Sequence, residues 1–424
     1  MPEPKVPNRW LVVVGAILIQ FCLGAIYAWS VYTTPLKDAG WSKTQTQWVF
    51  SAGLAFFAIV MVIAGRLMPK VGPRRLAMAG GFVLGTGYFL AGLLGATNFW
   101  STLLLVGVVG GSGIGLGYVV PIAVGMRWFP DKKGLVSGLA VAGFGFGSTL
   151  WMTLADSLGK LGGGHFLKNY GLDHTWMIYG VAYAVVCLVG AIWMRWPPDG
   201  WKPAGWNPQA ACAPGTHAAV GEDFTSSEML RTPQYYMILL TFACGASAGL
   251  MSIGLMKLFP MEALQANGLD KDTASSIATM AMGVCFALAN GLGRILWGML
   301  SDRIGRKTSL IIMYATQGVF VILFQWMAGS TATLYLFAVL IGFNFGGNFA
   351  LFPAITSDTF GNRYVGMNYG WVFLAYGLGG IFGPILGGKL GDLKNFPLAF
   401  TICGVLCLVA TGIIAMVKPA CKAA

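Results

Sequence analysis

Twelve apolar runs, each long enough to cross a lipid bilayer, follow one another along the chain. A bilayer core about 30 Å thick requires about 20 predominantly apolar residues in a helix. Backbone amides inside a membrane have no water to bond with, so each run is expected to form an α-helix. The sequence therefore predicts an all-α membrane protein with twelve transmembrane helices. We place them at residues 10–34, 45–69, 74–97, 100–128, 134–158, 173–196, 232–262, 273–300, 308–328, 332–356, 364–390 and 396–417.

Charged residues are too few for a water-soluble chain of this size. They make up 10% of the 424 residues, whereas hydrophobic residues make up 56%, and the mean hydropathy is +0.69. A soluble protein would need more charge to cover its surface. The net charge of +12 lies in short clusters between the apolar runs, not in a continuous basic stripe. This distribution argues against nucleic acid as a partner and leaves the lipid bilayer as the expected surroundings.

Most of the cysteines lie inside the apolar runs, where they are expected to be buried. Such an arrangement indicates neither a disulfide framework nor a metal cluster. A nucleophile–base pair and a phosphate-binding loop are also missing from the sequence. We therefore expect no cofactor, no metal and no enzymatic activity. The cysteines concerned are Cys22, Cys187, Cys244, Cys285, Cys403 and Cys407.

One long interruption divides the twelve runs into two groups of six. Residues 197–231 are rich in Pro, Gly, Ala and Asp, and we interpret them as a linker. The predicted organisation is a six-helix bundle over 1–196, a cytoplasmic linker over 197–231, and a second six-helix bundle over 232–424. With the amino terminus inside, 18 of the 27 basic residues lie in cytoplasmic segments and eight lie outside. Because Lys and Arg favour the cytoplasmic side, both termini are expected there.

The two groups repeat each other in sequence. Residues 65–75 read GRLMPKVGPRR and residues 298–308 read GMLSDRIGRKT, a displacement of 233 positions. The sequence WFPDKKGLVSG around Gly134 matches DTFGNRYVGMN around Gly366, a displacement of 232. A nearly constant displacement at two separated loops indicates a duplicated six-helix unit.

Arg294 lies deep inside the eighth run, and residues 273–300 contain no carboxylate to pair with it. A guanidinium stays charged in a protein. A charge near the bilayer centre costs at least a few kcal/mol and is kept there mainly for substrates, ions or gating. Arg294 also lies eight residues before Asp302, roughly 12 Å along the helix, which is farther than a side chain can snorkel. We interpret it as an anion-binding point in a membrane transporter. The alternative is a structural role, in which Arg294 pairs with backbone carbonyls of a helix broken near Gly291 and Gly293.

The pattern G-x-x-x-D-R-x-G-R-K at residues 298–307 resembles the loop signature of the major facilitator superfamily. The resemblance implies two six-helix halves and a gating role for Asp302, Arg303 and Arg306, although Asp302 could instead simply cap a helix. The first half departs from the signature because Pro69 stands where the acid belongs. A symmetrical gate is therefore not expected.

Four further stretches are similar to the oxalate/formate antiporter and monocarboxylate transporter branch of that superfamily. They are YAWSVY at 27–32, RWFPDKKG at 127–134, EMLRTPQ at 228–234, and ALFP at 350–353 with the Ser-Asp pair at 357–358. The similarity spans nearly the whole chain. In character the chain most resembles a bacterial homologue of the proton-linked lactate transporters.

The resemblance implies which residues bind substrate. An arginine of the eighth helix binds the substrate carboxylate in this branch, and Arg294 matches it. Oxalate exchangers add a lysine in the eleventh helix, where this chain has Tyr376. One fixed cation balances one negative charge in a low-dielectric cavity, so the expected substrate is a monoanion. Lactate carriers have an aspartate one turn before the arginine, where this chain has Asn290. The other matching positions are Tyr118, Phe345, Phe349, Phe373, Tyr27 and Asn348.

Proton coupling has no obvious side chain in the sequence. The histidines fall in predicted loops, so no imidazole is expected inside the membrane. Asp156 is the one acid that could be called membrane-embedded, and an interfacial position suits it better. The proton would then travel on the carboxyl group of the substrate, or be shared between substrate, Arg294 and water.

The sequence predicts a transporter that moves a small monocarboxylate, such as L-lactate, pyruvate or propionate, together with a proton by alternating access around Arg294. It is expected to act as a monomer in the cell inner membrane. The main alternative is an organic-anion exchanger of the oxalate/formate type. A substrate sensor without transport activity is a further possibility that measurable flux would exclude.

Overall fold

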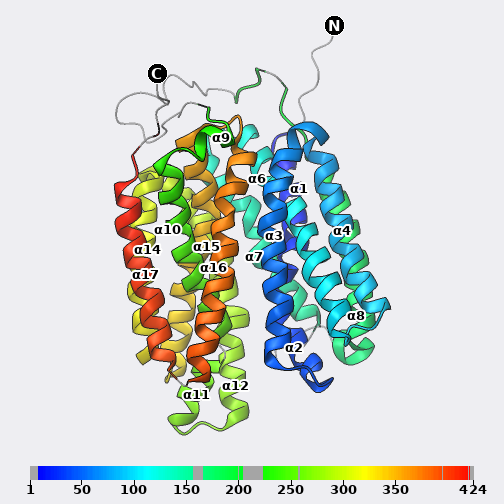
Figure 1. The fold of residues 1–424 in the computed structure, drawn as a ribbon, viewed down its shortest axis with the longest axis vertical. Helices are drawn as coiled ribbons and strands as arrows, with labels where there is room; N and C mark the ends of the chain where they lie inside the picture. The colour runs from blue at the N-terminus through cyan, green and yellow to red at the C-terminus, as the bar shows by residue number, and fades with distance from the viewer. Residues whose placement is uncertain are drawn as a thin grey trace.

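The computed structural model describes residues 8–155, 166–198, 200–203, 223–255, 258–393, 395–418 and 420. Every regular element among them is helical (Figure 1). The first half of the chain contributes α1 (Trp10–Leu23), the 3₁₀ segment η1 (Gly24–Ala28), α2 (Trp29–Asp38), α3 (Lys43–Val71), α4 (Pro73–Leu93), α5 (Phe99–Thr102), the π-helical η2 (Leu103–Gly110), α6 (Gly111–Trp128), α7 (Lys133–Ala155) and α8 (Phe166–Ala191). The second contributes α9 (Ser226–Met229), α10 (Pro233–Leu255), α11 (Leu258–Ala266), α12 (Lys271–Met280), the π-helical η5 (Ala281–Phe286), α13 (Ala287–Ile304), α14 (Arg306–Met327), α15 (Thr331–Phe360), α16 (Val365–Asp392) and α17 (Phe396–Met416).

Twelve helical stretches in the described residues are long and apolar enough to cross a membrane, which confirms the predicted number. The boundaries agree to within a few residues for most of them. The eighth, for example, was expected at 273–300 and runs over Thr273–Ile304. The seventh differs, because the expected segment 232–262 becomes a span over Pro233–Ile253 followed by the separate helix α11.

The repeated loops of the two halves have the same backbone conformation. Gly72 ends α3 with φ +87°, and Gly305 ends α13 with φ +89°. Each glycine is followed directly by the first residue of the next helix, Pro73 or Arg306. A positive φ is readily adopted only by glycine, which explains why both copies keep it at this turn.

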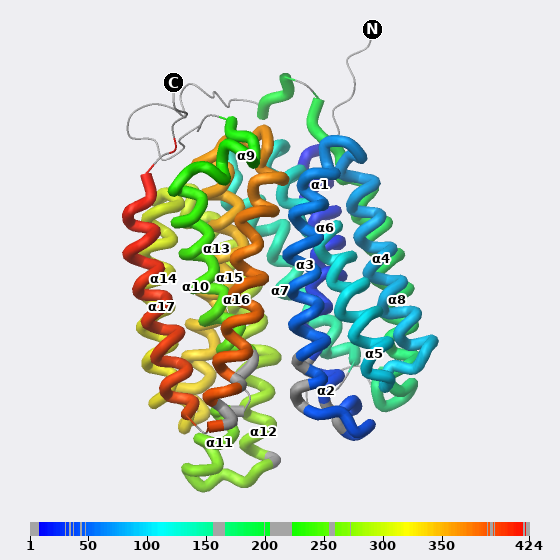
Figure 2. Tube along the Cα trace, in the orientation of Figure 1, coloured from blue at the N-terminus to red at the C-terminus, as the bar shows by residue number. Residues whose placement is uncertain are grey.

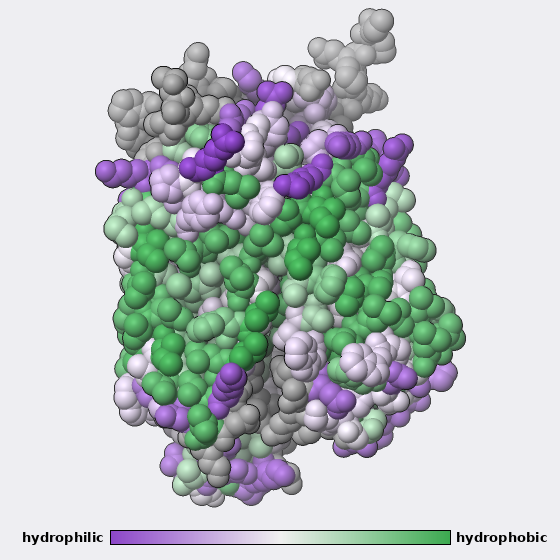
Figure 3. Space-filling view, viewed as in Figure 1, coloured by the Kyte–Doolittle hydropathy of each residue, from purple (hydrophilic) through white to green (hydrophobic). Residues whose placement is uncertain are grey.

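The helices of each half lie side by side (Figure 1). The two halves meet along α3, α7, α13 and α16. The helix α1 begins and α17 ends at the same end of the bundle, which we call the terminal end (top in Figure 1). The space-filling view shows a broad apolar belt between two polar ends (Figure 3). A belt of this kind is expected of a protein surrounded by lipid chains.

Residues 223–231, the last described part of the predicted linker, pack on the second half at the terminal end. The short helix α9 lies against α16 (Figure 2). The Phe224 amide donates to the Phe360 carbonyl (2.9 Å), and Asn368 bonds both the Phe224 carbonyl (2.9 Å) and the Ser226 hydroxyl (3.0 Å). The division into 1–196, 197–231 and 232–424 remains a prediction, and the structure places the end of the linker on the second bundle.

Candidate functional site

The helix α13 carries a polar stripe that faces the interior of the protein. Asn290, Arg294, Trp297 and Ser301 are buried and recur at spacings of three or four residues, which places them on one face. Leucines and Met299 cover the opposite face and are exposed, as expected against lipid. The pattern rotates Arg294 away from the membrane, and none of its surface is accessible.

The guanidinium of Arg294 lies at the interface between the two halves. Its Nε donates to Asn290 Oδ1 (3.1 Å), and its Nη1 donates to the carbonyl oxygen of Val141 in α7 (2.7 Å). The guanidinium carbon lies 4.2 Å from the centre of the Phe349 ring and 5.4 Å from that of Phe144. Aromatic faces attract cations, so these rings offset part of the cost of burying the charge.

Four buried donors at this site have no hydrogen-bond partner among the described residues. They are Nη2 of Arg294, Nδ2 of Asn290 and the hydroxyls of Tyr118 and Tyr369. Leaving a buried donor unpaired costs about 1–3 kcal/mol. A carboxylate is an acceptor of up to four hydrogen bonds and would satisfy such a set. The absence of a carboxylate partner for Arg294 among the described contacts leaves its charge available for one.

Four tyrosines pack on the aromatic rings of the site: Tyr27 and Tyr118 on Phe144, Tyr376 on Phe349, and Tyr369 on Phe373. Tyr27 comes from η1 in the first half and Tyr376 from α16 in the second, and their hydroxyls are hydrogen-bonded to each other. The site is therefore bridged by side chains of both halves, which is the location expected for a substrate that is handled by alternating access.

The expected aromatic residues form a continuous wall around the tyrosines. The ring of Phe373 lies 5.3 Å from Tyr118 and 5.0 Å from Tyr376, and Phe349 lies 5.4 Å from Tyr376. Phe345 is one turn before Phe349, with its ring centre 5.5 Å away. These rings are buried, so the wall is apolar apart from the hydroxyls.

Asn348 lies in the same helix as these phenylalanines but its amide bonds elsewhere. Its Oδ1 accepts from the hydroxyl of Tyr314 in α14 (2.6 Å), and its Nδ2 donates to the carbonyl of Phe345 (3.0 Å). Both groups thus have partners within the second half. A contact with substrate, expected from the resemblance, would require one of these bonds to break.

Several residues of the site were not singled out from the sequence. Phe144 and the carbonyl of Val141 contact Arg294 from the other half, and nothing in the local sequence around them signals this. Tyr369 could have been found, because it precedes Phe373 by four residues and Tyr376 by seven, which puts all three on one face of α16.

The alternative of a helix broken near the arginine is not what the structure contains. The helix α13 is continuous from Ala287 to Ile304 and includes Gly291 and Gly293. The departure from α geometry is the π segment η5, upstream of Asn290. The carbonyl that Arg294 contacts belongs to α7, a different helix of the other half.

The residues considered for proton coupling lie away from this site or outside the described part of the chain. Asp156, His165 and His217 are not among the described residues. His174 was expected in a loop, and the structure places it, exposed, in the first part of α8. It follows Gly171, where the backbone leaves helical geometry with φ +72°.

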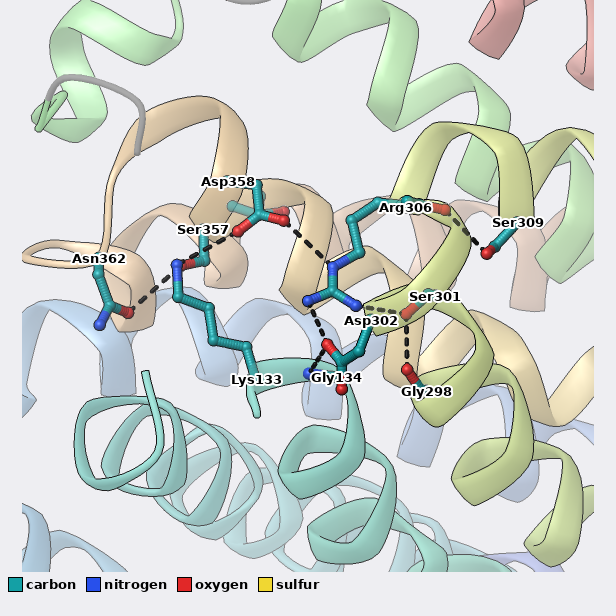
Figure 4. Close-up of polar contacts among 12 residues, drawn as sticks. Lys133, Gly134, Gly298, Ser301, Asp302, Arg306, Ser309, Ser357, Asp358 and Asn362 are labelled. Atoms are coloured by element: carbon teal, nitrogen blue, oxygen red, sulfur yellow. Dashed lines mark hydrogen bonds and ion pairs between the residues drawn. The ribbon is translucent and has the colours of Figure 1, made fainter. Parts of the chain in front are cut away.

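A second polar cluster joins the halves at the terminal end (Figure 4). The carboxylate of Asp302 accepts from the backbone amides of Gly134 (3.0 Å) and Leu135 (2.9 Å), at the start of α7. It therefore caps a helix of the opposite half. Arg306 contacts Asp302 (2.5 Å) and Asp358 (3.1 Å). Negative charge at a helix amino end is stabilising, so Asp302 stabilises the start of α7 while the cluster joins the two halves at the terminal end.

Lys133 adds a further link between the halves in the same cluster. Its ammonium lies 3.2 Å from Asp358 and 3.1 Å from the Ser357 hydroxyl (Figure 4). Arg303 is placed differently from its neighbours in the signature. It is exposed and lines a shallow hollow with Leu296, Met299 and Leu300.

The first half has Pro69 where the second half has Asp302, so α16 has no equivalent of the Asp302 cap on α7. Asp223 lies near the start of α16 instead. The Asp223 side chain accepts from the backbone amide of Arg363, just before α16 (3.0 Å). Arg127 donates to the Arg363 carbonyl (2.6 Å) and stacks on Trp196, 4.0 Å from the ring centre. Asp223 belongs to the predicted linker and was not singled out from the sequence.

Comparison with known proteins identifies the family. The sequence model of the Major Facilitator Superfamily matches residues 10–284 and 241–420. The chain belongs to the Major Facilitator Superfamily. It is 30% identical over 378 residues to the uncharacterized MFS-type transporter YhjX of Escherichia coli (strain K12), covering 88% of this chain and 86% of the relative.

Other relatives place the chain in the oxalate/formate and monocarboxylate branch of the family. It is 29% identical to the oxalate:formate antiporter of Oxalobacter formigenes, covering 97% of this chain and 92% of that protein. It is 24% identical to monocarboxylate transporter 13 of Rattus norvegicus, covering 96% and 88%. Among solved structures, the transporter FucP in the outward conformation shares the fold, with a TM-score of 0.66 at 16% identity over 95% of this chain and 97% of that one.

Proposed function

We propose that this protein is a secondary active transporter that moves a small monocarboxylate, such as L-lactate, across the cytoplasmic membrane together with a proton. The supporting observation is Arg294, a fully buried cation at the interface of the halves with an unpartnered nitrogen and, among the described contacts, no carboxylate. Burying an uncompensated charge is costly. A substrate anion that completes the site would recover part of that cost on binding.

The charge of the site and its apolar lining favour a short monoanion. The position that would supply a second cation for oxalate is Tyr376, and its hydroxyl is bonded to Tyr27. The rings of Phe345, Phe349 and Phe373 offer apolar surface for a short organic tail. Pyruvate, lactate and propionate fit this description. We propose that Tyr118 and Asn290 donate to the same carboxylate as Arg294.

We propose that the proton travels with the substrate carboxyl. A carboxylic acid beside a guanidinium is normally shifted towards its ionised form. The proton would therefore join late, as the aromatic wall closes and water is excluded, because burial favours the neutral form. Groups at the terminal end, including Asp302, are part of the gate in this scheme and do not carry the proton.

Alternating access would consist of rocking of the two halves about Arg294. In the closed terminal end, Asp302 and Lys133 join the halves, so access would be from the opposite end. The excess of basic residues in the segments on the side of the termini supports a cytoplasmic position for the terminal end, in the inner membrane of a bacterium. The site lies within one chain, so a monomer is sufficient.

Uptake into proteoliposomes tests the proposal. Purified protein is reconstituted, and entry of radiolabelled L-lactate, pyruvate, propionate and oxalate is measured with and without an inward proton gradient. We expect uptake of the monocarboxylates to accelerate with the gradient in vesicles that contain no organic anion. Liposomes without protein provide the background. Absence of uptake for every monocarboxylate would contradict the proposal.

The second candidate is exchange of two organic anions, favoured by the 29% identity to an oxalate:formate antiporter. The same vesicles separate the two functions. An exchanger would be indifferent to the proton gradient and would require an unlabelled anion inside. Dependence on an internal anion would replace symport by exchange while leaving the role of Arg294 intact.

A further inference from the structure

The duplicated loops of the two halves pack against each other crosswise. A Cβ added to Gly65 in α3 would lie 2.5 Å from the carbonyl oxygen of Gly366 in α16. A Cβ added to Gly298 in α13 would collide in the same way with the carbonyl of Gly134 in α7. Gly65 and Gly298 are 233 positions apart, and Gly134 and Gly366 are 232 apart. The pair α3–α16 is therefore the internal counterpart of the pair α13–α7.

The correspondence continues one turn farther into the protein. An added Cβ at Gly138 of α7 would collide with the carbonyl of Arg294, and one at Gly370 of α16 would lie 3.0 Å from the carbonyl of Met61. Gly138 and Gly370 are again 232 positions apart, and Met61 and Arg294 are 233 apart. Met61 thus occupies in α3 the place that Arg294 occupies in α13.

The next contact extends the symmetry to the level of the aromatic wall. A Cβ at Gly145 would lie 3.1 Å from the Cα of Gly291, and one at Gly377 would lie 2.8 Å from the Cβ of Ala58. Ala58 precedes Met61 by three residues, as Gly291 precedes Arg294. The two helix pairs therefore keep one register over at least three turns, from the terminal end to the site.

Met61 is as inaccessible as Arg294, with none of its surface exposed. Its neighbour one turn earlier, Phe57, already belongs to the site. The Phe57 ring lies 4.8 Å from Phe373, 5.0 Å from Tyr118 and 6.2 Å from Tyr376. Through Phe57, this part of α3 therefore packs against the aromatic wall and the tyrosines of the site. The symmetry relates position 61 to position 294, and Phe57, one turn before Met61 in the same helix, contacts the aromatic wall.

We propose that Met61 determines the charge and tail length of the substrate that this site accepts. The inference rests on the proposed function of Arg294 as the carboxylate-binding residue. The carboxylate lies at Arg294, and the other end of the substrate lies against Met61 and Phe57. A thioether is apolar and adaptable, so it accepts a methyl, ethyl or hydroxyethyl tail. It offers nothing to compensate a second carboxylate, whose burial is unfavourable without a partner.

Two matched acids and three variants test the assignment. Propionate and malonate have the same number of carbon atoms but differ by one carboxylate. Binding of each to purified protein in detergent is measured by the shift in melting temperature and by titration calorimetry. The variants are Met61→Lys, Met61→Ala and, as the volume-matched apolar control, Met61→Leu.

We expect Met61→Lys to shift the malonate-to-propionate affinity ratio towards malonate by about tenfold or more, as one charged hydrogen bond would. Met61→Leu should leave the ratio unchanged. Met61→Ala should raise the affinity for valerate relative to propionate, because space opens at the tail end. If Met61→Lys does not fold, the valerate result decides the question.

The outcomes for the site and for the function can be told apart. Wild-type protein that binds propionate, together with unchanged acid preferences in folded Met61→Lys and in Met61→Ala, would overturn the role of Met61 alone. Wild-type protein that binds neither propionate nor lactate would overturn the proposed function. A shift of the ratio in Met61→Leu equal to that in Met61→Lys would also overturn the charge argument.

Discussion

Replacement of Arg294 by glutamine removes the positive charge at the centre of the site while keeping a side chain that can donate a hydrogen bond. The structure leaves Nη2 unpartnered and engages Nη1 once, with Val141. A carboxylate could therefore accept two bonds from the guanidinium. Hydrogen bonds to charged groups contribute about 1.5–3 kcal/mol each and a neutral bond about 1 kcal/mol. The net loss on Arg294→Gln is two charged bonds less one neutral bond, about 2–5 kcal/mol, which is about 30- to 4,000-fold in affinity.

The assay is titration of lactate or propionate into purified protein, accompanied by uptake into proteoliposomes. Arg294→Lys keeps the charge but not the planar fork, and should lie between the wild type and Arg294→Gln. Arg75→Gln, an exposed arginine at the start of α4, loses the same charge elsewhere and should bind normally.

Thermal unfolding separates a binding role from a structural one. Since Arg294 is buried without a carboxylate partner among the described contacts, its neutral replacement should leave the melting temperature unchanged or raise it. A structural role predicts a lower melting temperature, because the bonds to Val141 and Asn290 would weaken. Arg294→Gln protein that binds lactate within threefold of the wild type, or that loses binding only because it unfolds, would refute the reasoning.

Three further changes probe the site and the gate. Tyr376→Lys supplies a second cation and should shift uptake towards oxalate by about tenfold or more; an unchanged substrate profile would contradict the single-cation argument. Asp302→Ala removes the cap on α7, which costs about 1–2 kcal/mol of stabilisation, and should shift the equilibrium between closed and open terminal end about 5- to 30-fold towards the open form. Spin-label distances across the terminal end measure this shift, and unchanged distances would show that the cap does not set the equilibrium. Gly138→Ala forces α7 away from the Arg294 carbonyl and should cost about 1–3 kcal/mol and slow uptake, whereas Gly412→Ala, which meets nothing within 4 Å, should do neither; equal effects of the two would argue against close packing at this contact.

The spans and the inward position of Arg294 were accessible from the sequence for one physical reason. Both depend on the free-energy cost of placing polar groups in hydrocarbon, and the order of apolar and polar residues in the sequence shows where that cost is avoided. In α13 the leucines are exposed to lipid while Asn290, Arg294 and Trp297 are buried, as this free-energy cost requires. The duplicated loops were also visible, because Gly72 and Gly305 need a backbone that other residues avoid.

Contacts between helices were less accessible, because they depend on the rotation and depth of each helix. Asn348 and Phe349 are adjacent in sequence, yet the asparagine bonds Tyr314 within the second half while the phenylalanine lies against Arg294. Neighbouring positions in a helix differ by about 100° in direction. The partner carbonyl of Val141 carries no signal at all, since every residue has a carbonyl. The role of Asp223 was hidden because its partner lies 140 positions away.

The hydroxyl pair of Tyr27 and Tyr376 has a consequence for the economy of the transport cycle. Each half contributes one hydroxyl, so this hydrogen bond can connect the two halves when no substrate is bound. Such a transporter could change between its inward-open and outward-open states without substrate. Proton-driven accumulation of substrate requires this reorientation of the empty transporter. Obligatory one-for-one exchange requires that the empty transporter does not reorient. Removal of a single oxygen, in Tyr27→Phe, would then slow net accumulation more than it slows the swapping of labelled for unlabelled acid.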